Sequence, residues 1–425
     1  MTAPPADATD PLDGDTAIGR KGCAGNELGE PLSATQPQAP TGSAHRVIAS
    51  APAKVNLILR VGTVDAQGYH ALATVFEALS LREFVTAELV ADVARGDSLP
   101  SVRTVVYEVG VDGVPQFSPE TTAELADLDG PRHLAVRAAA VLGADSRIAL
   151  TVYKTVPVAG GMAGGSADAA ASLVAVNELL GRGLSPDQLQ EIGRGLGADV
   201  PACLVGGIAL GTGRGDRMRV LREGANESDA DSNWWVLVTA DFGLSTPAVF
   251  NRFDAMVEVG AGRSVSKPAH PGRSDLVRSD CGERAGPQGD EAGQNEAADS
   301  GGDESDAARG MAPQVAPAEL AALGGTLQVG DLAGLLVNDL QAAALVMRPE
   351  LAGVGEKLAE LSALGWLVSG SGPTLAALAA SRADAERIAA AVRTADLPGV
   401  RDAWVAYGPT SGAQLEPELP AWTTN

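Results

Sequence analysis

The chain has 425 residues, with 31 basic and 54 acidic side chains and a formal net charge of −23 at pH 7. This excess of negative charge repels phosphate backbones and anionic lipid headgroups, which argues against nucleic acid or a membrane surface as a partner. The three cysteines and four histidines are widely spaced, which argues against a disulfide framework or a protein-held metal site and favours a cytoplasmic setting. The chemistry is therefore expected from carboxylates, a cation or the backbone.

Two segments are too polar to form a core. Residues 1–45 are rich in Pro, Ala, Thr, Asp and Gly, and residues 258–312 hold eleven acids, six bases and few large apolar side chains. So little apolar burial does not offset the entropy lost on ordering. We predict a disordered acidic tail over 1–45, an N-terminal domain over 46–217, a C-terminal domain over 218–412 interrupted by a disordered insertion at 258–312, and a short tail over 413–425.

Within the two domains, patterns typical of strands and helices alternate. Alternating apolar residues predict half-buried strands over 55–61 and 148–152, the second ending at Pro157, and a further strand is expected around 403–407. Ser185-Pro-Asp-Gln is a capping box that begins a helix extending to Gly197. Another helix is expected over 383–392. This mixture predicts an α+β fold or two α/β layers.

A glycine-rich loop is the most informative feature. Four glycines follow the strand that ends at Pro157, and Ser166 is the expected N-cap of the next helix. Glycine permits positive φ and close approach of a ligand, while a helix N-terminus presents unpaired N–H groups and a partial positive charge. The combination predicts a triphosphate site, with a mobile glycine linker as the alternative. The predicted phosphate-binding residues are Pro157, Val158, Ala159, Gly160, Gly161, Met162, Ala163, Gly164, Gly165 and Ser166.

Two charged residues are candidates for chemistry. Lys54 begins a strand, and a period of two places it on one face with Asn56, where an ammonium and an amide can orient a hydroxyl and a phosphate. Asp199 follows a helix end and is able to accept a proton from an alcohol. An exposed lysine and an Asx turn are the simpler interpretations of these two positions. A third segment, Ser369-Gly-Ser-Gly-Pro-Thr, is typical of a turn between strands.

In this order, Ala51-Pro-Ala-Lys-Val-Asn-Leu, the loop over 157–170 and Ser369-Gly-Ser-Gly-Pro-Thr resemble the three motifs of the GHMP small-molecule kinases, which include galactokinase, homoserine kinase and mevalonate kinase. Gly68-Tyr-His, Leu196-Gly-Ala-Asp-Val-Pro and Ser245-Thr-Pro-Ala-Val-Phe resemble the branch that phosphorylates a diphosphocytidyl derivative of methylerythritol in the non-mevalonate isoprenoid route. The resemblance implies a two-domain α+β fold, with an N-terminal α/β domain that carries the loop and a ferredoxin-like C-terminal domain. It also implies ATP with Mg²⁺ as the phosphoryl donor; we expect a monomer or weak homodimer.

The resemblance further implies roles for individual residues. Asp199 would be the base that accepts the proton of the substrate's 2-hydroxyl. Lys54 would keep that carboxylate ionised and lower the pKa of the hydroxyl. The residues implied to contact the cytidyl substrate are Asn56 at the methylerythritol part, Tyr69 and Phe250 on either side of the cytosine ring, and His70 at the edge of that ring.

Two positions depart from the family pattern. Ala167 stands where the loop usually has a second serine. The family asparagine that helps to hold adenine is either replaced here by His133 or displaced along the chain. One alternative is another kinase of this family, acting on homoserine, mevalonate or a sugar. A nucleotide-binding regulator without catalytic activity is a second alternative, against which the presence of both Lys54 and Asp199 argues.

Overall fold

The computed structural model describes residues 46–65, 67–90, 98–109, 115–125, 129–158, 160–225, 231–260, 312–325 and 327–424. The predicted tail over 1–45 and nearly all of the predicted insertion lie outside these residues. Residues 258–260 form the end of helix α6 (Thr246–Gly260), so the predicted start of the insertion at 258 was too early.

Nine strands form a large sheet in the order β13-β1-β2-β5-β3-β4, with β6 paired to β2, β7 to β6, and β9 to β1. These strands are β1 (Arg46–Val64), β2 (His70–Leu89), β3 (Ser101–Val109), β4 (Pro115–Phe117), β5 (Ile148–Lys154), β6 (Ile208–Thr212), β7 (Arg217–Arg222), β9 (Val337–Asn338) and β13 (Gln414–Glu416). The predicted boundary at 217/218 cuts through β7, and the predicted C-terminal tail contains β13. Backbone hydrogen bonds to neighbouring strands hold both segments in this sheet.

Four antiparallel strands form a second sheet in the order β10-β11-β8-β12. They are β8 (Asn233–Ala240), β10 (Gly365–Val368), β11 (Leu375–Ala379) and β12 (Val400–Gly408). Helix α6 follows β8 and helix α11 (Arg382–Thr394) connects β11 to β12, which gives the strand–helix–strand–strand–helix–strand order of a ferredoxin-like unit. The predicted α+β fold class is confirmed, as are the helix over 383–392 and the strand at 403–407.

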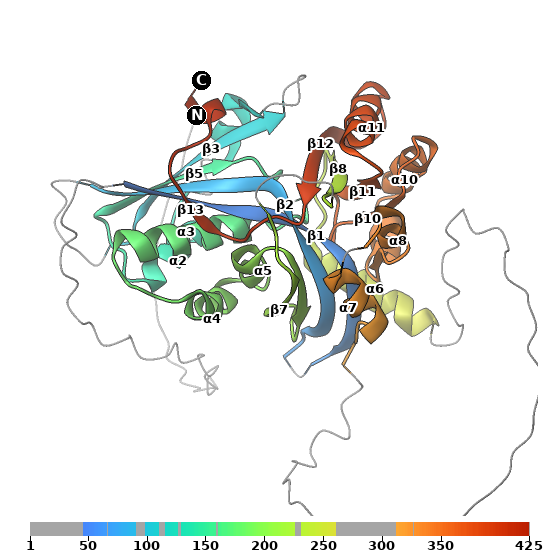
Figure 1. Cartoon of the computed structure of the whole chain (residues 1–425), viewed down its shortest axis with the longest axis horizontal. Coiled ribbons are helices and arrows are strands. Elements are labelled where there is room, and N and C mark those ends of the chain that lie inside the picture. The colour runs from blue at the N-terminus through green and yellow to red at the C-terminus, as the bar shows by residue number, and fades with distance from the viewer. Residues whose placement is uncertain are drawn as a thin grey trace, which may run out of the picture. The chain divides into compact units, whose positions relative to one another are not determined.

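Helices cover the outer faces of the two sheets. Helices α2 (Leu134–Val141), α3 (Gly164–Leu179), α4 (Pro186–Leu196) and α5 (Val200–Val205) pack on one face of the large sheet (Figure 1). Its other face packs against the small sheet, whose far side is covered by α10 (Glu350–Glu360) and α11. The capping box that begins α4 is present as predicted. The remaining helices are α1 (Pro119–Leu125), α7 (Pro317–Gly324), α8 (Val329–Ala333), α9 (Gln341–Met347) and a 3-10 turn at Ala421–Thr424.

Strand β1 is covered on both faces, whereas the sequence predicted a half-buried strand. Its central eleven residues are all buried. A register shift in the pairing with β2 lies between Pro52 and Lys54, and such a bulge changes which residues point to which face. Before the shift Ala51 packs with the helices, and after it Val55 packs in the core shared with the small sheet. Lys54 and Asn56, which alternate with Val55, therefore project to the helical side.

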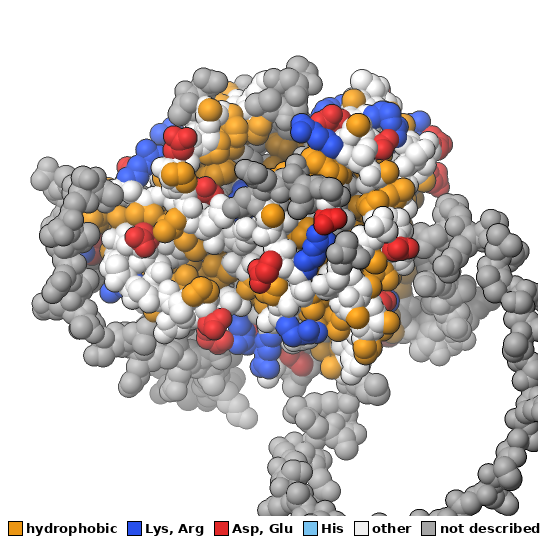
Figure 2. All heavy atoms as spheres, viewed as in Figure 1, with side chains coloured by type: hydrophobic (Ala, Val, Ile, Leu, Met, Phe, Trp, Pro, Cys, Tyr) orange, Lys and Arg blue, Asp and Glu red, His pale blue; other side chains and the backbone are white. Residues whose placement is uncertain are grey.

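The charged surface contains both signs. On the face shown in Figure 2, basic and acidic side chains are interspersed among apolar ones. In the part of the chain that the structure describes, no helix has the length and apolar character needed to cross a bilayer.

Glu77 on β2 connects the two sheets. Its fully buried carboxylate accepts hydrogen bonds from Asn233 Nδ2 at 2.8 Å and from Trp235 Nε1 at 3.1 Å, both on β8. Burial raises the pKa of Glu77 to about 7, although these two donors act in the opposite direction. Between the ordinary pKa of 4.5 and this raised value, the folded protein therefore holds a proton that the unfolded chain has released.

We predict that Glu77 makes the free energy of unfolding fall by about 2 to 3 kcal/mol between pH 5 and pH 8. Its stabilising proton is fully present below the unfolded pKa and is lost as the pH rises through the folded pKa of about 7. Denaturant unfolding of the wild type and of Glu77→Gln at a series of pH values measures this effect. Between pH 5 and pH 8, the free energy of unfolding of the variant should fall by about 2 to 3 kcal/mol less than that of the wild type. Parallel pH profiles for the two proteins would contradict the assignment.

Candidate active site

The glycine-rich loop connects β5 to α3. Strand β5 ends at Lys154 rather than at the predicted Pro157, and α3 begins at Gly164. The N-cap is Ala163, with a φ of 63° and no side-chain hydrogen bond to the helix. The prediction that Ser166 is the N-cap was therefore wrong, because Ser166 lies within the first turn. The left-handed turn at Ala163 starts the helix earlier than a serine cap would. The first N–H groups of α3 thus have no cap, which leaves them available to an anion.

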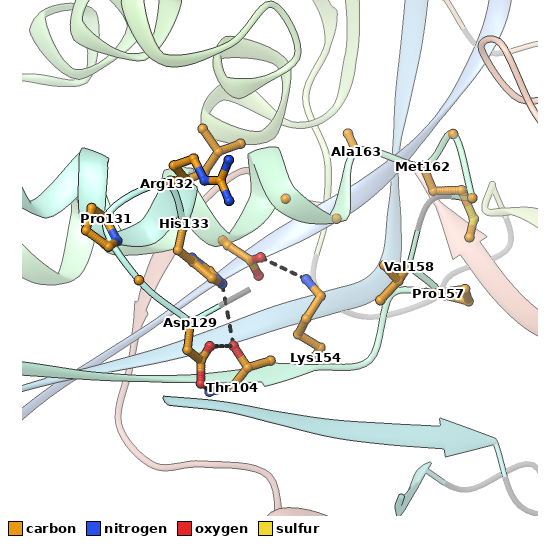
Figure 3. Close-up of a pocket in the computed structure, with 17 residues that line it drawn as sticks. Thr104, Asp129, Pro131, Arg132, His133, Lys154, Pro157, Val158, Met162 and Ala163 are labelled. Carbon is orange, nitrogen blue, oxygen red and sulfur yellow. Dashed lines mark hydrogen bonds and ion pairs between the residues drawn. The ribbon is translucent and has the colours of Figure 1, made fainter. Parts of the chain in front are cut away.

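A cavity of about 540 Å³ lies beside this loop (Figure 3). Loop residues line one end of it, and residues 129–134, which lead into α2, line the other, with Lys154 between them. The predicted phosphate-binding residues that line it are Pro157, Val158, Gly160, Gly161, Met162, Ala163, Gly164 and Gly165. Ser166 follows them in α3, and Ala159 lies outside the described residues. The structure thus brings most of the predicted phosphate-binding residues to one wall of this cavity.

Lys54 and Asp199 come together next to the loop. Lys54 Nζ lies 3.9 Å from Asp199 Oδ2; the lysine side chain is 5% exposed and the aspartate side chain 38%. Lys54 also donates to Asn56 Oδ1 at 2.7 Å and to the carbonyl of Gly161 at 2.9 Å. Asn56 donates in turn to Thr74 Oγ1 at 2.8 Å, which keeps its oxygen directed at the ammonium. A fixed ammonium beside a solvent-accessible carboxylate is suited to an alcohol and a phosphoryl group.

The turn between β10 and β11 reaches the same carbonyl. Ser369 Oγ donates to Gly161 O at 3.1 Å. Gly370 lies so close that a Cβ there would be 3.3 Å from Lys54 Nζ. Asn338 Nδ2 holds the turn by donating to the carbonyl of Gly370 at 2.7 Å. Three motifs that are distant in the sequence therefore meet at the peptide group of Gly161.

The residues predicted to bind a cytosine ring fall into two groups. His70 stacks on Phe250 of α6 with ring centroids 4.9 Å apart. Its Nδ1 lies 2.9 Å from a backbone carbonyl, and its Nε2 lies 3.3 Å from Asp254 Oδ2. Tyr69 is 55% exposed, and the guanidinium carbon of Arg214 lies 3.8 Å from its ring centroid. Here His70 packs on Phe250 while Tyr69 pairs with arginine; binding of cytosine between Tyr69 and Phe250 stays a prediction.

A buried ion cluster was not predicted. Lys154 Nζ lies 2.8 Å from both Glu83 Oε1 and Asp168 Oδ2, and all three side chains are buried. Glu83 Oε2 also accepts from the backbone N–H of Thr155 at 2.7 Å, so the cluster fixes the chain where it enters the loop. A signal was present in the sequence, because Lys154 shares a period-two face with Val152 and other buried apolar residues of β5. A charge on such a face requires a partner.

Burial and charge act against each other in this cluster. Burial raises the pKa of Glu83 to about 7, although the ammonium of Lys154 opposes this shift. Burial alone would lower the pKa of Lys154, but the two carboxylates outweigh it and raise that pKa above its ordinary value. Two carboxylates thus share one firmly protonated lysine at the wall of the cavity.

His133 caps helix α2. Its Nδ1 accepts a hydrogen bond from the N–H of Ala135 at 3.1 Å, so the ring proton belongs on Nε2, which lies 3.5 Å from Thr104 Oγ1. Burial lowers the pKa of His133, which favours this neutral form. An asparagine at this position would be an equally good cap, so the departure from the family pattern preserves the start of α2.

A 4-diphosphocytidyl-2-C-methyl-D-erythritol kinase of Salinispora tropica is 38% identical to this chain over 381 residues, covering 88% of this chain and 96% of that protein. Residues 133–207 match the GHMP kinases N terminal domain, and residues 319–397 match GHMP kinases C terminal. The chain belongs to the GHMP kinase family. A protein of the same name from Kineococcus radiotolerans is 40% identical to this GHMP kinase over 347 residues, covering 81% of this chain and 84% of the relative.

Solved structures agree with this assignment. A crystal structure of 4-(cytidine 5'-diphospho)-2C-methyl-D-erythritol kinase has a TM-score of 0.52 and 25% identity, covering 85% of this GHMP kinase and 98% of that chain. The mevalonate kinase of L. major has a TM-score of 0.51 at 14% identity, covering 89% and 99%, and so shows the shared fold alone. Family and relatives together make this protein an ATP-dependent kinase of a small molecule.

We predict that Gly161→Ala lowers the free energy of unfolding by about 2 to 5 kcal/mol, because a left-handed alanine costs about 1 to 2 kcal/mol and overpacking about 1 to 3 kcal/mol. Gly161 has a φ of +74°, and a Cβ there would lie 2.3 Å from the carbonyl oxygen of Ser369. Gly165→Ala is the matched control, since the nearest atom to its Cβ would be Leu134 Cδ1 at 3.6 Å. Thermal and denaturant unfolding compare the two variants; equal losses would contradict the role of Gly161.

Proposed function

We propose that this GHMP kinase transfers the γ-phosphoryl group of ATP to the 2-hydroxyl of 4-diphosphocytidyl-2-C-methyl-D-erythritol, a step of the non-mevalonate route to isoprenoid precursors. The observation that carries the proposal is the meeting of Lys54, Asp199 and the glycine loop at Gly161. Curated relatives at 35% to 40% identity that bear this enzyme's name support the choice of substrate.

The loop would hold the phosphates. Phosphoryl transfer depends on in-line positioning and on neutralisation of charge more than on covalent chemistry. The uncapped N–H groups at the start of α3 are suited to bind the phosphate oxygens. Mg²⁺ would arrive with the nucleotide, since the described residues hold no group of three or more His, Cys, Asp or Glu side chains that could bind a metal ion. The metal's contribution would be to neutralise phosphate charge.

Asp199 would act as the base for the acceptor alcohol. Its side chain is 38% exposed, so a substrate hydroxyl is able to reach the carboxylate, whereas Lys54 is held in place by the loop and by Asn56. The proton of the hydroxyl would pass to Asp199 as the oxygen attacks the γ-phosphorus. Lys54 would stabilise the negative charge that develops between the attacking oxygen and the phosphoryl group.

Asn56, Tyr69, His70 and Phe250 would bind the cytidyl substrate. Tyr69 supplies an exposed ring, and Arg214 already lies over it at 3.8 Å. Stacking of cytosine on Tyr69 requires the guanidinium to stay on the opposite face or to move away. In the second case, the diphosphate of the substrate is a fitting partner for it, because arginine binds phosphate oxygens in pairs.

The experiment that tests this proposal is ATP-dependent ADP release by purified protein with a panel of acceptors. The panel contains 4-diphosphocytidyl-2-C-methyl-D-erythritol, mevalonate, homoserine and galactose. We expect kcat/KM for the cytidyl compound to exceed that of the others by at least about a hundredfold, because buried polar groups made for one substrate reject compounds that leave them unpaired. Phosphorus NMR of the product should place the new phosphate on the 2-hydroxyl.

The control is Asp199→Asn, which keeps the shape of the side chain but not its basicity. It should slow turnover of the preferred acceptor by about 10² to 10⁴, the usual contribution of a general base. Comparable turnover of two or more acceptors by the wild type would overturn the choice of substrate. Full turnover by the variant would overturn the role of Asp199 alone.

A further inference from the structure

Thr74 on β2 is a buried threonine whose hydroxyl makes hydrogen bonds in two directions. The residue is 1% exposed. Its Oγ1 donates to the carbonyl of Ile58 at 2.8 Å and accepts from Asn56 Nδ2 at 2.8 Å. The register of β1 against β2 shifts between Asn56 and Ile58, so this one hydroxyl bonds to residues on both sides of the shift. Thr74 therefore ties the irregular part of β1 to the side chain that lies beside Lys54.

The direction of these hydrogen bonds is fixed at both ends. A backbone carbonyl only accepts, so the Thr74 hydroxyl donates to Ile58 and keeps its lone pairs for Asn56. The amide of Asn56 then turns its NH₂ toward Thr74, which leaves the amide oxygen for Lys54. An ammonium only donates, and Lys54 Nζ reaches that oxygen at 2.7 Å. The reverse orientation of the amide would place two donors against each other at Lys54.

Burial makes the hydroxyl hard to replace. Asn56 is 3% exposed and Lys54 is 4% exposed, so bulk water has little access to either side chain. A buried amide N–H that loses its acceptor costs free energy. Without the hydroxyl we therefore expect the Asn56 amide to rotate toward another acceptor and to withdraw its oxygen from Lys54. The ammonium would then be held by the carbonyl of Gly161 but no longer by the amide.

We propose that Thr74 is a positioning residue for phosphoryl transfer. Its hydroxyl orients the amide of Asn56, and that amide holds the ammonium of Lys54 beside the carboxylate of Asp199. Thr74 acts through Asn56 and takes no part in bond making. The inference rests on the proposed function for the roles of Lys54 and Asp199, whereas the identity of the acceptor alcohol does not enter.

The substitution Thr74→Val tests the proposal, because valine keeps the branched shape of threonine but neither donates nor accepts. ADP release at saturating ATP and acceptor measures kcat. It should fall about tenfold to a hundredfold, the usual effect of losing one hydrogen bond to a charged group. Affinity for ATP, measured by calorimetry without acceptor, should stay near that of the wild type, because the predicted phosphate site lies on the glycine loop and the start of α3. A merely structural loss would lower both.

A second pair of variants isolates the hydroxyl. Thr74→Ser and Thr74→Ala both lack the methyl group and differ from each other in the hydroxyl alone. The serine variant should be about tenfold to a hundredfold faster than the alanine variant, for the same reason. This comparison also serves if Thr74→Val does not fold.

Thr410→Val is the matched control. Thr410 is 2% exposed, and its Oγ1 also donates to a backbone carbonyl of β2, that of Leu79 at 2.9 Å. This variant loses a comparable buried hydrogen bond outside the candidate active site. Its free energy of unfolding should fall in denaturant as that of Thr74→Val does, while its kcat should stay near the wild-type value.

A double-mutant cycle with Asn56→Ala shows whether Thr74 acts through the amide. Thr74→Val should lower kcat in the wild type but have no further effect in Asn56→Ala. Equal losses in the two backgrounds would overturn the proposal. So would wild-type kcat in folded Thr74→Val, equal rates for the serine and alanine variants, or an equal loss of kcat in Thr410→Val.

Failure of the proposed substrate is read separately. The variants are compared with whichever acceptor of the panel the wild type prefers. A preference for mevalonate, homoserine or galactose would count against the proposed substrate alone, because the comparison of the Thr74 variants concerns the placement of Lys54.

Discussion

The hydrogen bond from Lys54 Nζ to the carbonyl of Gly161 is the interaction on which the site depends. It connects the first strand of the large sheet to the glycine loop at 2.9 Å. Ser369 of the small sheet's turn donates to the same oxygen at 3.1 Å, and Asp199 lies 3.9 Å from the same ammonium. Because one peptide group receives both donors, a displacement of the loop would disturb the lysine, the carboxylate and the turn of the second sheet together.

The position of Lys54 follows from how β1 is packed. The large sheet is covered by helices on one face and by the small sheet on the other, so β1 has no solvent-facing side in its centre. A lysine in such a strand needs partners, and after the register shift next to Pro52 it meets the carbonyl of Gly161 in the loop before α3 and the carboxylate of Asp199 at the N-cap of α5. In the proposed function, the low exposure of Lys54 suits it to act as a fixed charge, and the accessibility of Asp199 suits it to meet the substrate.

Much of this could be predicted from the sequence, because local rules determine it. The glycine loop, the capping box at Ser185 and the turn at 369–374 are set by residues close together in the chain, and the structure contains all three. The early start of α3 at Gly164 was missed because a left-handed alanine, rather than a serine side chain, precedes the helix. Propensity rules do not anticipate such a cap.

Long-range contacts set the features that the sequence did not predict. The cluster of Lys154, Glu83 and Asp168 joins a strand end, a second strand and a helix, and only the inward position of Lys154 on β5 pointed to it. The pairing of β13 with β1, which places the C-terminal segment in the N-terminal sheet, likewise depends on topology. Stacking of His70 on Phe250 brings a hairpin end to α6, which no local pattern could show.

A double-mutant cycle on the chemical step shows whether Lys54 and Asp199 act on the substrate as one unit. Single-turnover phosphoryl transfer is measured at saturating ATP and acceptor for the wild type, Lys54→Met, Asp199→Asn and the double variant. Groups that act as a unit lose most of their effect when either one is removed. If the two residues act as one unit, the double variant is no slower than the slower single variant. Losses that multiply in the double variant would contradict it.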